Sequence, residues 1–458
     1  MKTAFSVFAG VLFFCSSLFA QVKSPEQFLG YPIGTKHTPH HLVQRYFEYV
    51  AAVANDRVQL QQYGRTNEGR PLLLAIVTSP ENRSRIEDIR TANLKLVYKS
   101  IAAPGNKVEQ QPAIVWLSYN VHGNEASSTE AAMQTIYELI KDQSPCADWL
   151  KNTVVLIDPC LNPDGRDRYV NWYQSVVGKE FNPLPNAREH QEPWPGGRSN
   201  HYYFDLNRDW LPLAPPESKA KISWYHQWYP NVTTDFHEMG ANSTYFFEPT
   251  KPYGSENPVV PRKNYDDINP KFAKYFAKYM DQIGSLYWTK EVFDNSYPGY
   301  GSSYPDMHGG LGLVFETASS RGHIQSSQRG DLTFAFTIRN HVVNSLATMD
   351  AALANREYMH RYLREFFEGA IAEGSKDLSK NYVFGDETDP SRNRLFLQFL
   401  MDHKIKVYEN TADLSVAGQT FKKGSSWVVP TKQPQYRMVR TMFEYVTTFA
   451  DSVFYDAS

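Results

Sequence analysis

Cysteine and excess charge are both scarce in this sequence, and each shortage excludes a class of protein. Three of the 458 residues are cysteines, too few for a scaffold held together by several disulfides. Cys146 and Cys160 are compatible either with one disulfide or with two separate buried thiols. The formal net charge is −2, and no basic run favours nucleic acid or an anionic membrane as a partner.

Long apolar runs are also nearly absent, and the one near the N-terminus is short. Lys2 precedes an apolar stretch at about 5–14, and Ala20 offers a cleavage site before Gln21. This order of features predicts a secretory signal peptide over residues 1–20. The stretch is too short to cross a bilayer, and no later run is long enough to do so. We therefore predict a secreted or periplasmic protein without a membrane span.

The rest of the sequence shows a regular alternation of apolar runs and helical patterns. Turn residues bound the apolar runs, which predict buried strands at 58–63, 71–78, 113–119, 153–157, 232–236 and 311–316. Helical periodicity predicts helices within 40–55, 125–141 and 334–372. Strands that alternate with helices are typical of a three-layer α/β/α sandwich around a mostly parallel mixed sheet. We assign this main domain to residues 21–375.

A smaller accessory α/β region is predicted at residues 376–458. Its pattern indicates a strand at 382–385, a helix at 393–403 and strands at 404–408 and 424–430. None of these segments carries a chemical motif. Because the sequence stops soon after a further predicted helix, without a tapering tail, we expect it to be part of a longer chain that continues into a further domain.

Three residues with metal-binding side chains stand at or near the ends of two predicted strands. His122 and Glu125 are three residues apart where a strand gives way to a helix, and His237 follows a second strand. In sheets of this kind, ligands bind outside the carboxyl ends of the strands. Two imidazoles and one carboxylate are a common ligand set for a catalytic zinc, whose fourth position stays open for water. We therefore predict one Zn2+ held by these three side chains.

Glu316 lies inside an apolar predicted strand. A carboxylate is costly to bury there without a partner, so a functional reason for this residue is favoured over a structural one. Burial would also raise the pKa of its side chain, which suits a general base.

Short motifs follow one another in a fixed order along the chain. They are Gly-x-x-x-Glu-Gly-Arg at 64–70, His-Gly-Asn-Glu at 122–125, Asn-Pro-Asp-Gly at 162–165, Asp-Leu-Asn-Arg at 205–208, Thr-Asp-Phe-His at 234–237 and Gly-Leu-Val-Phe-Glu at 312–316. In this order they resemble the zinc carboxypeptidase family of pancreatic-type and bacterial enzymes, over about residues 40–351. The resemblance implies a zinc metallocarboxypeptidase that hydrolyses the C-terminal peptide bond of peptides or proteins, and the predicted signal peptide implies that it is exported.

The resemblance also implies a role for each residue that matches the family's motifs. His122, Glu125 and His237 match the zinc ligands, and Glu316 matches the catalytic glutamate. Asp205 matches the residue that orients a ligand histidine, and Arg198 matches the residue that polarises the scissile carbonyl. Asn207 and Arg208 match the pair that holds the substrate's terminal carboxylate. Tyr297 matches the tyrosine that caps the bound substrate. Because a guanidinium fork fits a carboxylate through two hydrogen bonds, this clamp implies cleavage beside a free C-terminus.

Some of these assignments have alternatives in the sequence. They are Arg166 and Arg168 in place of Arg198, and Tyr300 and Tyr304 in place of Tyr297. Asn124 stands where many family members have a substrate-binding arginine, which puts the outer subsite in question. Asp306 is compatible with attraction of a basic substrate side chain and with a cap on a turn.

Two other functions are compatible with the same motifs. A cell-wall peptidase of this fold would cut peptidoglycan stem peptides with the same ligands. A relative without catalysis would only bind peptide C-termini, but such a protein has no need of Glu316. The sequence predicts neither a C-terminal side-chain preference nor an oligomeric state.

Overall fold

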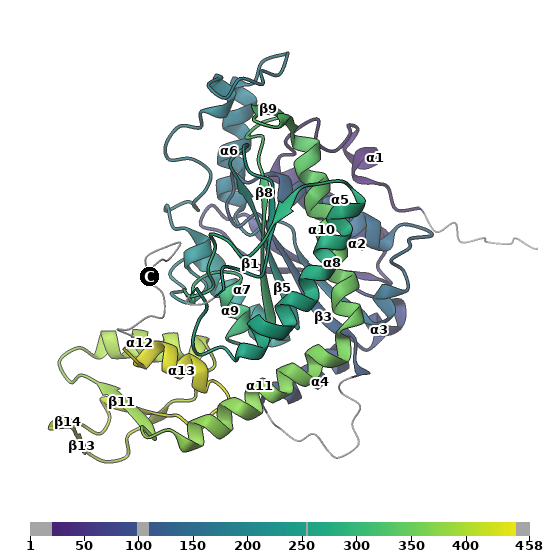
Figure 1. Cartoon of the computed structure of the whole chain (residues 1–458). Coiled ribbons are helices and arrows are strands. Elements are labelled where there is room, and N and C mark those ends of the chain that lie inside the picture. The colour runs from purple at the N-terminus through teal and green to yellow at the C-terminus, as the bar shows by residue number, and fades with distance from the viewer. Residues whose placement is uncertain (1–20, 99–109, 253–254, 446–458) are drawn as a thin grey trace, which may run out of the picture.

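A mixed sheet of eight strands forms the centre of the molecule (Figure 1). The computed structural model describes residues 21–98, 110–252 and 255–445, so the predicted signal peptide at 1–20 lies outside the described residues. The strand order is β1-β2-β4-β3-β5-β8-β6-β7. The strands are β1 (Val58–Arg65), β2 (Pro71–Val77), β3 (Ala113–Tyr119), β4 (Thr153–Asp158), β5 (Val232–Met239), β6 (Tyr245–Phe247), β7 (Tyr287–Trp288) and β8 (Leu311–Ala318).

The four central strands β4, β3, β5 and β8 run parallel to one another. Antiparallel strands flank them, with β1 and β2 on one side and β6 on the other. Every residue of β3 and β4 is buried, as expected for parallel strands with both faces covered. The prediction of a mostly parallel mixed sheet is therefore confirmed.

Helices cover both faces of the sheet and complete three layers (Figure 1). On one face lie α2 (His40–Val53), α5 (Ser127–Ile140), α8 (Asn269–Gln282) and α10 (Phe334–Ala354). The opposite face carries α4 (Ile86–Tyr98) and α7 (Pro216–Trp228), with α11 (Arg356–Lys376) packed on α4. The remaining helices of the main domain are α1 (Pro25–Leu29), α3 (Pro80–Ser84), α6 (Pro163–Val176) and α9 (Ser303–Asp306). Over the described ranges, no helix has the length and apolar character needed to cross a bilayer.

The accessory region folds as a small antiparallel sheet with helices beside it. Its elements are β11 (Asn381–Gly385), α12 (Pro390–Asp402), β12 (Tyr408–Glu409), the hairpin β13 (Leu414–Val416) and β14 (Gln419–Phe421), β15 (Ser426–Pro430) and α13 (Tyr436–Phe443). Leu400, Val429 and Met438 belong to the same buried apolar cluster as the main domain. The accessory region is therefore packed onto the main core, and the division at residues 375 and 376 stays a prediction.

The strand predicted at 404–408 is wrong except at its last residue, because the end of α12 takes its place. Lys404 adopts a left-handed conformation with φ 60°. The amide of Ile405 then donates to the carbonyl oxygen of Leu400 at 3.0 Å, which closes the end of the helix. Only Tyr408–Glu409 pairs as a strand.

Cys146 and Cys160 are both buried and unbridged. Of the two interpretations of this pair, two separate thiols is therefore correct. The Cys160 thiol lies 3.3 Å from Oδ1 of Asn120.

A buried ion pair joins α5 to α6. Nη2 of Arg166 lies 2.9 Å from Oε1 of Glu130, and both side chains are fully buried. The same guanidinium donates to the carbonyl oxygens of Ala126 and Thr38, each at 2.9 Å, while Thr38 itself donates to Glu130. These contacts engage Arg166 inside the core, so it is not available to replace Arg198.

Arg166→Met is expected to destabilise the protein by about 3–5 kcal/mol, because it leaves the Glu130 carboxylate buried without its cation. The double variant Arg166→Met/Glu130→Gln should recover part of that loss. Urea denaturation followed by circular dichroism would measure the free energy of unfolding of both. An equal loss in the single and double variants would contradict this account of the pair.

Candidate metal centre

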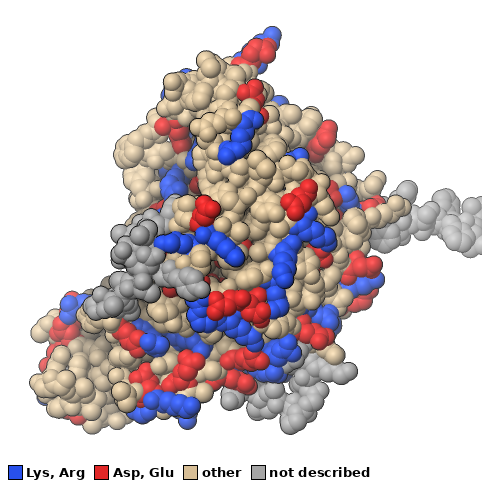
Figure 2. All heavy atoms as spheres, in the orientation of Figure 1, with Lys and Arg blue, Asp and Glu red and all other residues tan. Residues whose placement is uncertain are grey.

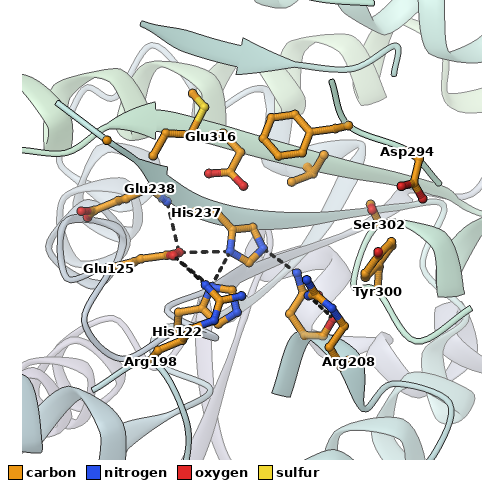
Figure 3. Close-up of a pocket in the computed structure, with 15 residues that line it drawn as sticks. His122, Glu125, Arg198, Arg208, His237, Glu238, Asp294, Tyr300, Ser302 and Glu316 are labelled. Atoms are coloured by element: carbon orange, nitrogen blue, oxygen red, sulfur yellow. Dashed lines mark hydrogen bonds and ion pairs between the residues drawn. The ribbon is translucent and has the colours of Figure 1, made fainter. Parts of the chain in front are cut away.

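An open cavity of about 290 Å³ lies at the carboxyl ends of the central strands (Figure 3). Its walls are formed by His122, Glu125, Arg198, Asn207, Arg208, His237, Glu238, Met239, Gly240, Phe293, Asp294, Tyr300, Ser302, Val314 and Glu316. In Figure 3, Glu316 points into the cavity from β8, Arg198 lies beside His122, and Arg208 lies with Tyr300 on the other side. The fold thus brings seven of the nine predicted site residues to this cavity.

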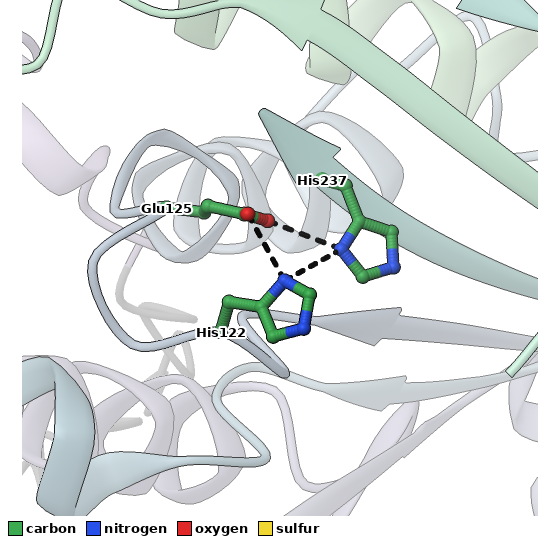
Figure 4. A group of neighbouring side chains, drawn as sticks. All are labelled: His122, Glu125 and His237. Carbon is green, nitrogen blue, oxygen red and sulfur yellow. Dashed lines mark hydrogen bonds and ion pairs between the residues drawn. The ribbon is translucent and has the colours of Figure 1, made fainter. Parts of the chain in front are cut away.

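The three predicted ligands meet at one point of the cavity wall (Figure 4). Nδ1 of His122 lies 3.0 Å from Oε1 of Glu125, Nδ1 of His237 lies 3.1 Å from Oε2, and the two Nδ1 atoms are 3.2 Å apart. Donor atoms placed tetrahedrally around zinc at its usual bond lengths lie about 3.3 Å from each other. The chemistry and spacing of the donors therefore fit zinc, and the described residues contain no other group of this kind.

A tight turn brings His122 and Glu125 together. Asn120 follows β3 in a left-handed conformation with φ 56°. Its side-chain amide donates to the carbonyl oxygens of His122 at 2.7 Å and Glu125 at 2.9 Å. His237 approaches from β5, where it pairs in register with Glu316 of β8. The sheet thereby fixes Glu316, the predicted general base, opposite one of the predicted ligands.

The turn also requires a glycine at position 123, because other backbone segments lie against it. A Cβ atom on Gly123 would come within 2.2 Å of the backbone carbon of Gly165 and 2.6 Å of the carbonyl oxygen of Gly197. A Cβ atom on Gly165 would meet the same oxygen at 2.4 Å. The segment that carries Arg198 therefore packs directly on the turn that carries the ligands.

A carboxylate contacts the far nitrogen of each ligand imidazole. Oδ1 of Asp205 lies 3.0 Å from Nε2 of His122, and Oδ2 of Asp235 lies 2.8 Å from Nε2 of His237. Such contacts orient the ring and leave the other nitrogen for a metal. Asp235 was not predicted as a site residue, although side chains two apart in a strand share a face, which is the signal that places it behind His237.

Asp205 and Glu316 have their pKa values shifted in opposite directions. Burial works to raise the pKa of Asp205, but its hydrogen bond to His122 and the charges of Arg198 and Arg208 hold it well below its ordinary value. Burial raises the pKa of Glu316 to about 7. Asp205 is therefore a permanent anion at neutral pH, while Glu316 can exchange a proton.

Arg198, Asp205 and Arg208 form a row along the cavity. Nη2 of Arg198 lies 2.9 Å from Oδ2 of Asp205, and its Nη1 lies 3.6 Å from Oε1 of Glu125. Nη1 of Arg208 lies 3.9 Å from the same aspartate oxygen, and its guanidinium lies 4.9 Å from the centre of the Tyr300 ring. Two arginines thus face the cavity on either side of one partly buried anion.

The three candidate tyrosines occupy different environments. Tyr297 donates its hydroxyl to the carbonyl oxygen of Arg208 at 2.9 Å, whereas Tyr300 lines the cavity. Tyr304 is fully buried and its hydroxyl contacts two buried histidines, so it is not available to a substrate. The capping role of Tyr297 stays a prediction.

Two further alternatives point away from the cavity. Arg168 donates to the carbonyl oxygens of Gly196 at 2.8 Å and Asn200 at 3.2 Å. Asp306 is fully buried and accepts from the amide of Gly312 at 2.9 Å, so it caps a turn. Its attraction of a basic substrate side chain is therefore excluded by its position.

A model of the zinc carboxypeptidase family matches residues 43–310. The match covers more than half of the chain, and the protein belongs to this family. The matched residues include His122, Glu125 and His237, but they end before Glu316. The fold and the ligand cluster are consistent with that membership.

Curated relatives with partial similarity include two carboxypeptidases. Carboxypeptidase 2 of Trichophyton rubrum is 26% identical over 194 residues, which are 41% of this chain and 31% of that protein. Carboxypeptidase E of Caenorhabditis elegans is 26% identical over 199 residues, 41% of this chain and 34% of that protein. The alignments thus span about a third of the length of these relatives.

Two solved structures show lower sequence identity over more of the chain. A metallo-carboxypeptidase from Burkholderia cenocepacia is 17% identical with a TM-score of 0.45, and the match covers 67% of this chain and 68% of that one. Carboxypeptidase A from Helicoverpa armigera is 14% identical with a TM-score of 0.44, and the match covers 72% and 76%.

Metal affinity is expected to depend on Asp235. Asp235→Asn preserves the shape of the side chain but removes the charge behind His237, and loss of such a partner typically weakens metal binding by about 10–100-fold. Competition for Zn2+ between the metal-free protein and a chromophoric chelator would measure the change. Asp331→Asn, at an exposed position of β10 (Gly330–Thr333), is the matched control. Equal affinities of the two variants would show that the Asp235 carboxylate does not support the metal.

Proposed function

We propose that this protein is an exported zinc metallocarboxypeptidase that hydrolyses the C-terminal peptide bond of peptides. One observation carries the proposal: the three ligand side chains share a cavity with Glu316 on one wall and Arg208 on another. Family membership and the donor set support it. Export rests on the signal peptide proposed at residues 1–20 and gives a secreted or periplasmic enzyme.

Zinc, when bound, supplies the Lewis acidity that makes water a nucleophile near neutral pH. Glu316 takes the proton that this water loses and delivers it to the leaving amine. Its position opposite His237 and its raised pKa suit both steps. Arg198 stabilises the negative charge that develops on the scissile carbonyl oxygen, and its contact with Asp205 holds the guanidinium beside the ligands.

Asn207 and Arg208 bind the terminal carboxylate of the substrate. A guanidinium matches the two carboxylate oxygens with parallel hydrogen bonds, which an ammonium group cannot do. Tyr300 supports the face of the Arg208 fork, and Tyr297, which is bonded to the Arg208 backbone, closes over the bound residue. A substrate without a free C-terminus lacks the group that this clamp recognises.

Glu316→Gln is expected to lower the rate of peptide hydrolysis by about 10²–10⁴-fold, because it removes the proton acceptor. The measurement is mass spectrometry of a mixed peptide pool incubated with the zinc-loaded protein and with the variant. Loss of single C-terminal residues should occur with the wild type alone and should spare C-terminally amidated peptides. The zinc content of the variant, measured in parallel, controls for damage to the ligands.

If the wild type leaves every free peptide intact, the proposal fails for that substrate class. Purified muropeptides would then test cleavage of cell-wall stem peptides. Binding of peptides without cleavage of either substrate would indicate a protein that only recognises C-termini.

Activity is expected to fall as the pH is lowered through the pKa of Glu316, because only the ionised carboxylate accepts a proton. Burial raises this pKa from 4.5 to about 7 in the metal-free protein, and a nearby cation lowers it again. The acid limb of kcat/KM should therefore lie between these two values. A profile of kcat/KM against pH would locate it, with pre-incubation at each pH to exclude unfolding. A flat profile across that range would contradict the role of Glu316.

A further inference from the structure

A long segment with little regular structure links α6 to the turn at Leu206–Arg208, and four exposed aromatic side chains lie in its second half. Trp194 is 84% exposed, Tyr202 63%, Tyr203 56% and Phe204 46%. We call these four residues the aromatic rim. Long irregular connections in compact proteins are usually functional, and gathered exposed apolar side chains mark interaction sites.

The segment that bears the rim is fastened to the metal centre. Glu192 accepts hydrogen bonds from the side chain of Asn124 at 2.8 Å and from the amide of Gly197 at 2.5 Å. Arg168 donates to the carbonyl oxygens of Gly196 and Asn200. Asn124 directly precedes the predicted ligand Glu125. These hydrogen bonds therefore hold the backbone of the rim segment beside the predicted metal site.

The order of groups along the cavity determines where a bound peptide must run. Figure 3 shows Arg208 with Tyr300 and Asp294 on one side of the ligand histidines, and Arg198 on the other. A peptide whose terminal carboxylate binds Arg208 places its last bond at the ligands. The chain that precedes this bond then leaves past Arg198, which belongs to the same segment as the rim, between Trp194 and Tyr202.

We propose that the aromatic rim binds the part of a peptide substrate that precedes the cleaved bond and selects apolar or aromatic residues there. This inference rests on the proposed function and adds a substrate preference to it. The occupant is a peptide because the rim belongs to the same segment as Arg198, which lines the cavity on the side where the substrate chain leaves the predicted ligands.

The chemistry of the rim favours apolar partners. Trp and Tyr side chains bury large areas on contact and prefer offset or edge-on aromatic neighbours; the Trp194 and Tyr203 rings already lie 5.5 Å apart. Two charged groups beside the rim already have partners: Glu192 accepts from the Asn124 side chain and the Gly197 amide, and Arg168 of α6 donates to carbonyl oxygens of the segment. The surface beside α6 is predominantly uncharged on the face shown in Figure 2.

The test compares peptides that share one C-terminal residue but differ in length and in the residues before the cleaved bond. One is a short N-acylated dipeptide, and the longer ones carry either phenylalanine or glutamate two and three positions upstream of the cleaved bond. The zinc-loaded full-length wild type should prefer the long phenylalanine peptide. Trp194→Ala and Tyr203→Ala should each reduce that preference, measured as the ratio of kcat/KM between long and short peptides, by about tenfold through KM.

Tyr408→Ala, which removes an equally exposed tyrosine from the accessory region, is the matched control. An unchanged ratio in both rim variants, or a wild type that does not distinguish phenylalanine from glutamate, would overturn the proposal. The proposal would also be overturned if Trp194→Ala reduced cleavage of muropeptides but left the ratio of kcat/KM between long and short peptides unchanged. A parallel loss on the short dipeptide would also overturn it, because it would show that the rim only supports the fold of the site.

A binding measurement separates failure of the rim from failure of the proposed function. Fluorescence polarisation of the labelled long peptides with zinc-loaded Glu316→Gln reports affinity without cleavage. Glu316→Gln should bind the phenylalanine peptide more tightly than the glutamate peptide, and the double variant Glu316→Gln/Trp194→Ala should not. This result would support peptide binding by the rim even if the wild type cleaves nothing. Equal binding with and without Trp194 overturns the rim even if the wild type is an active carboxypeptidase.

Discussion

The orientation of two buried imidazole rings is the constraint on which the rest of this structure depends. His122 and His237 must both turn Nδ1 toward Glu125, although two nitrogen lone pairs at 3.2 Å repel each other until a cation lies between them. Asp205 and Asp235 hold the opposite nitrogens and so select this arrangement before any metal binds. The site is thus prepared by carboxylates that do not themselves belong to the ligand set.

Asp235 brings a carboxylate into the core, and Lys221 of α7 is a buried amine whose protonation this carboxylate favours. Asp235 lies in register with Ser118 of β3, which in turn pairs with Asp158 of β4. Lys221 is fully buried, with its ammonium 3.5 Å from the centre of the Trp210 ring. Burial lowers the pKa of Lys221 to about 7, against the opposing effect of Asp235 and Asp158. A lone buried carboxylate behind His237 would be costly, so the lysine is part of what makes that position tolerable.

The sequence predicted those parts of the fold whose patterns are local and apolar. Apolar runs predict the central strands and the strand that contains the glutamate of β8, and position at a strand end predicts the ligand turn. Helix α7 was not predicted, because its buried face includes Glu217, Lys221 and His226. With polar residues on that face, the sequence shows no apolar helical periodicity. Asp235 was missed for a related reason: its importance comes from a contact across the strand face, and no short motif records such a contact.

The accessory region was predicted as an appendage, but its contacts reach the loop that borders the cavity. His403, just past the end of α12, donates from Nε2 to the carbonyl oxygen of Leu211 at 2.9 Å and accepts the Tyr304 hydroxyl at 2.7 Å. Tyr304 belongs to the same short segment as Tyr300, which supports Arg208. Without this region Tyr304 would keep only its contact with His226, and loss of the second buried hydrogen bond would weaken the segment beside the proposed carboxylate clamp. The predicted accessory region therefore contributes contacts to the segments that border the cavity.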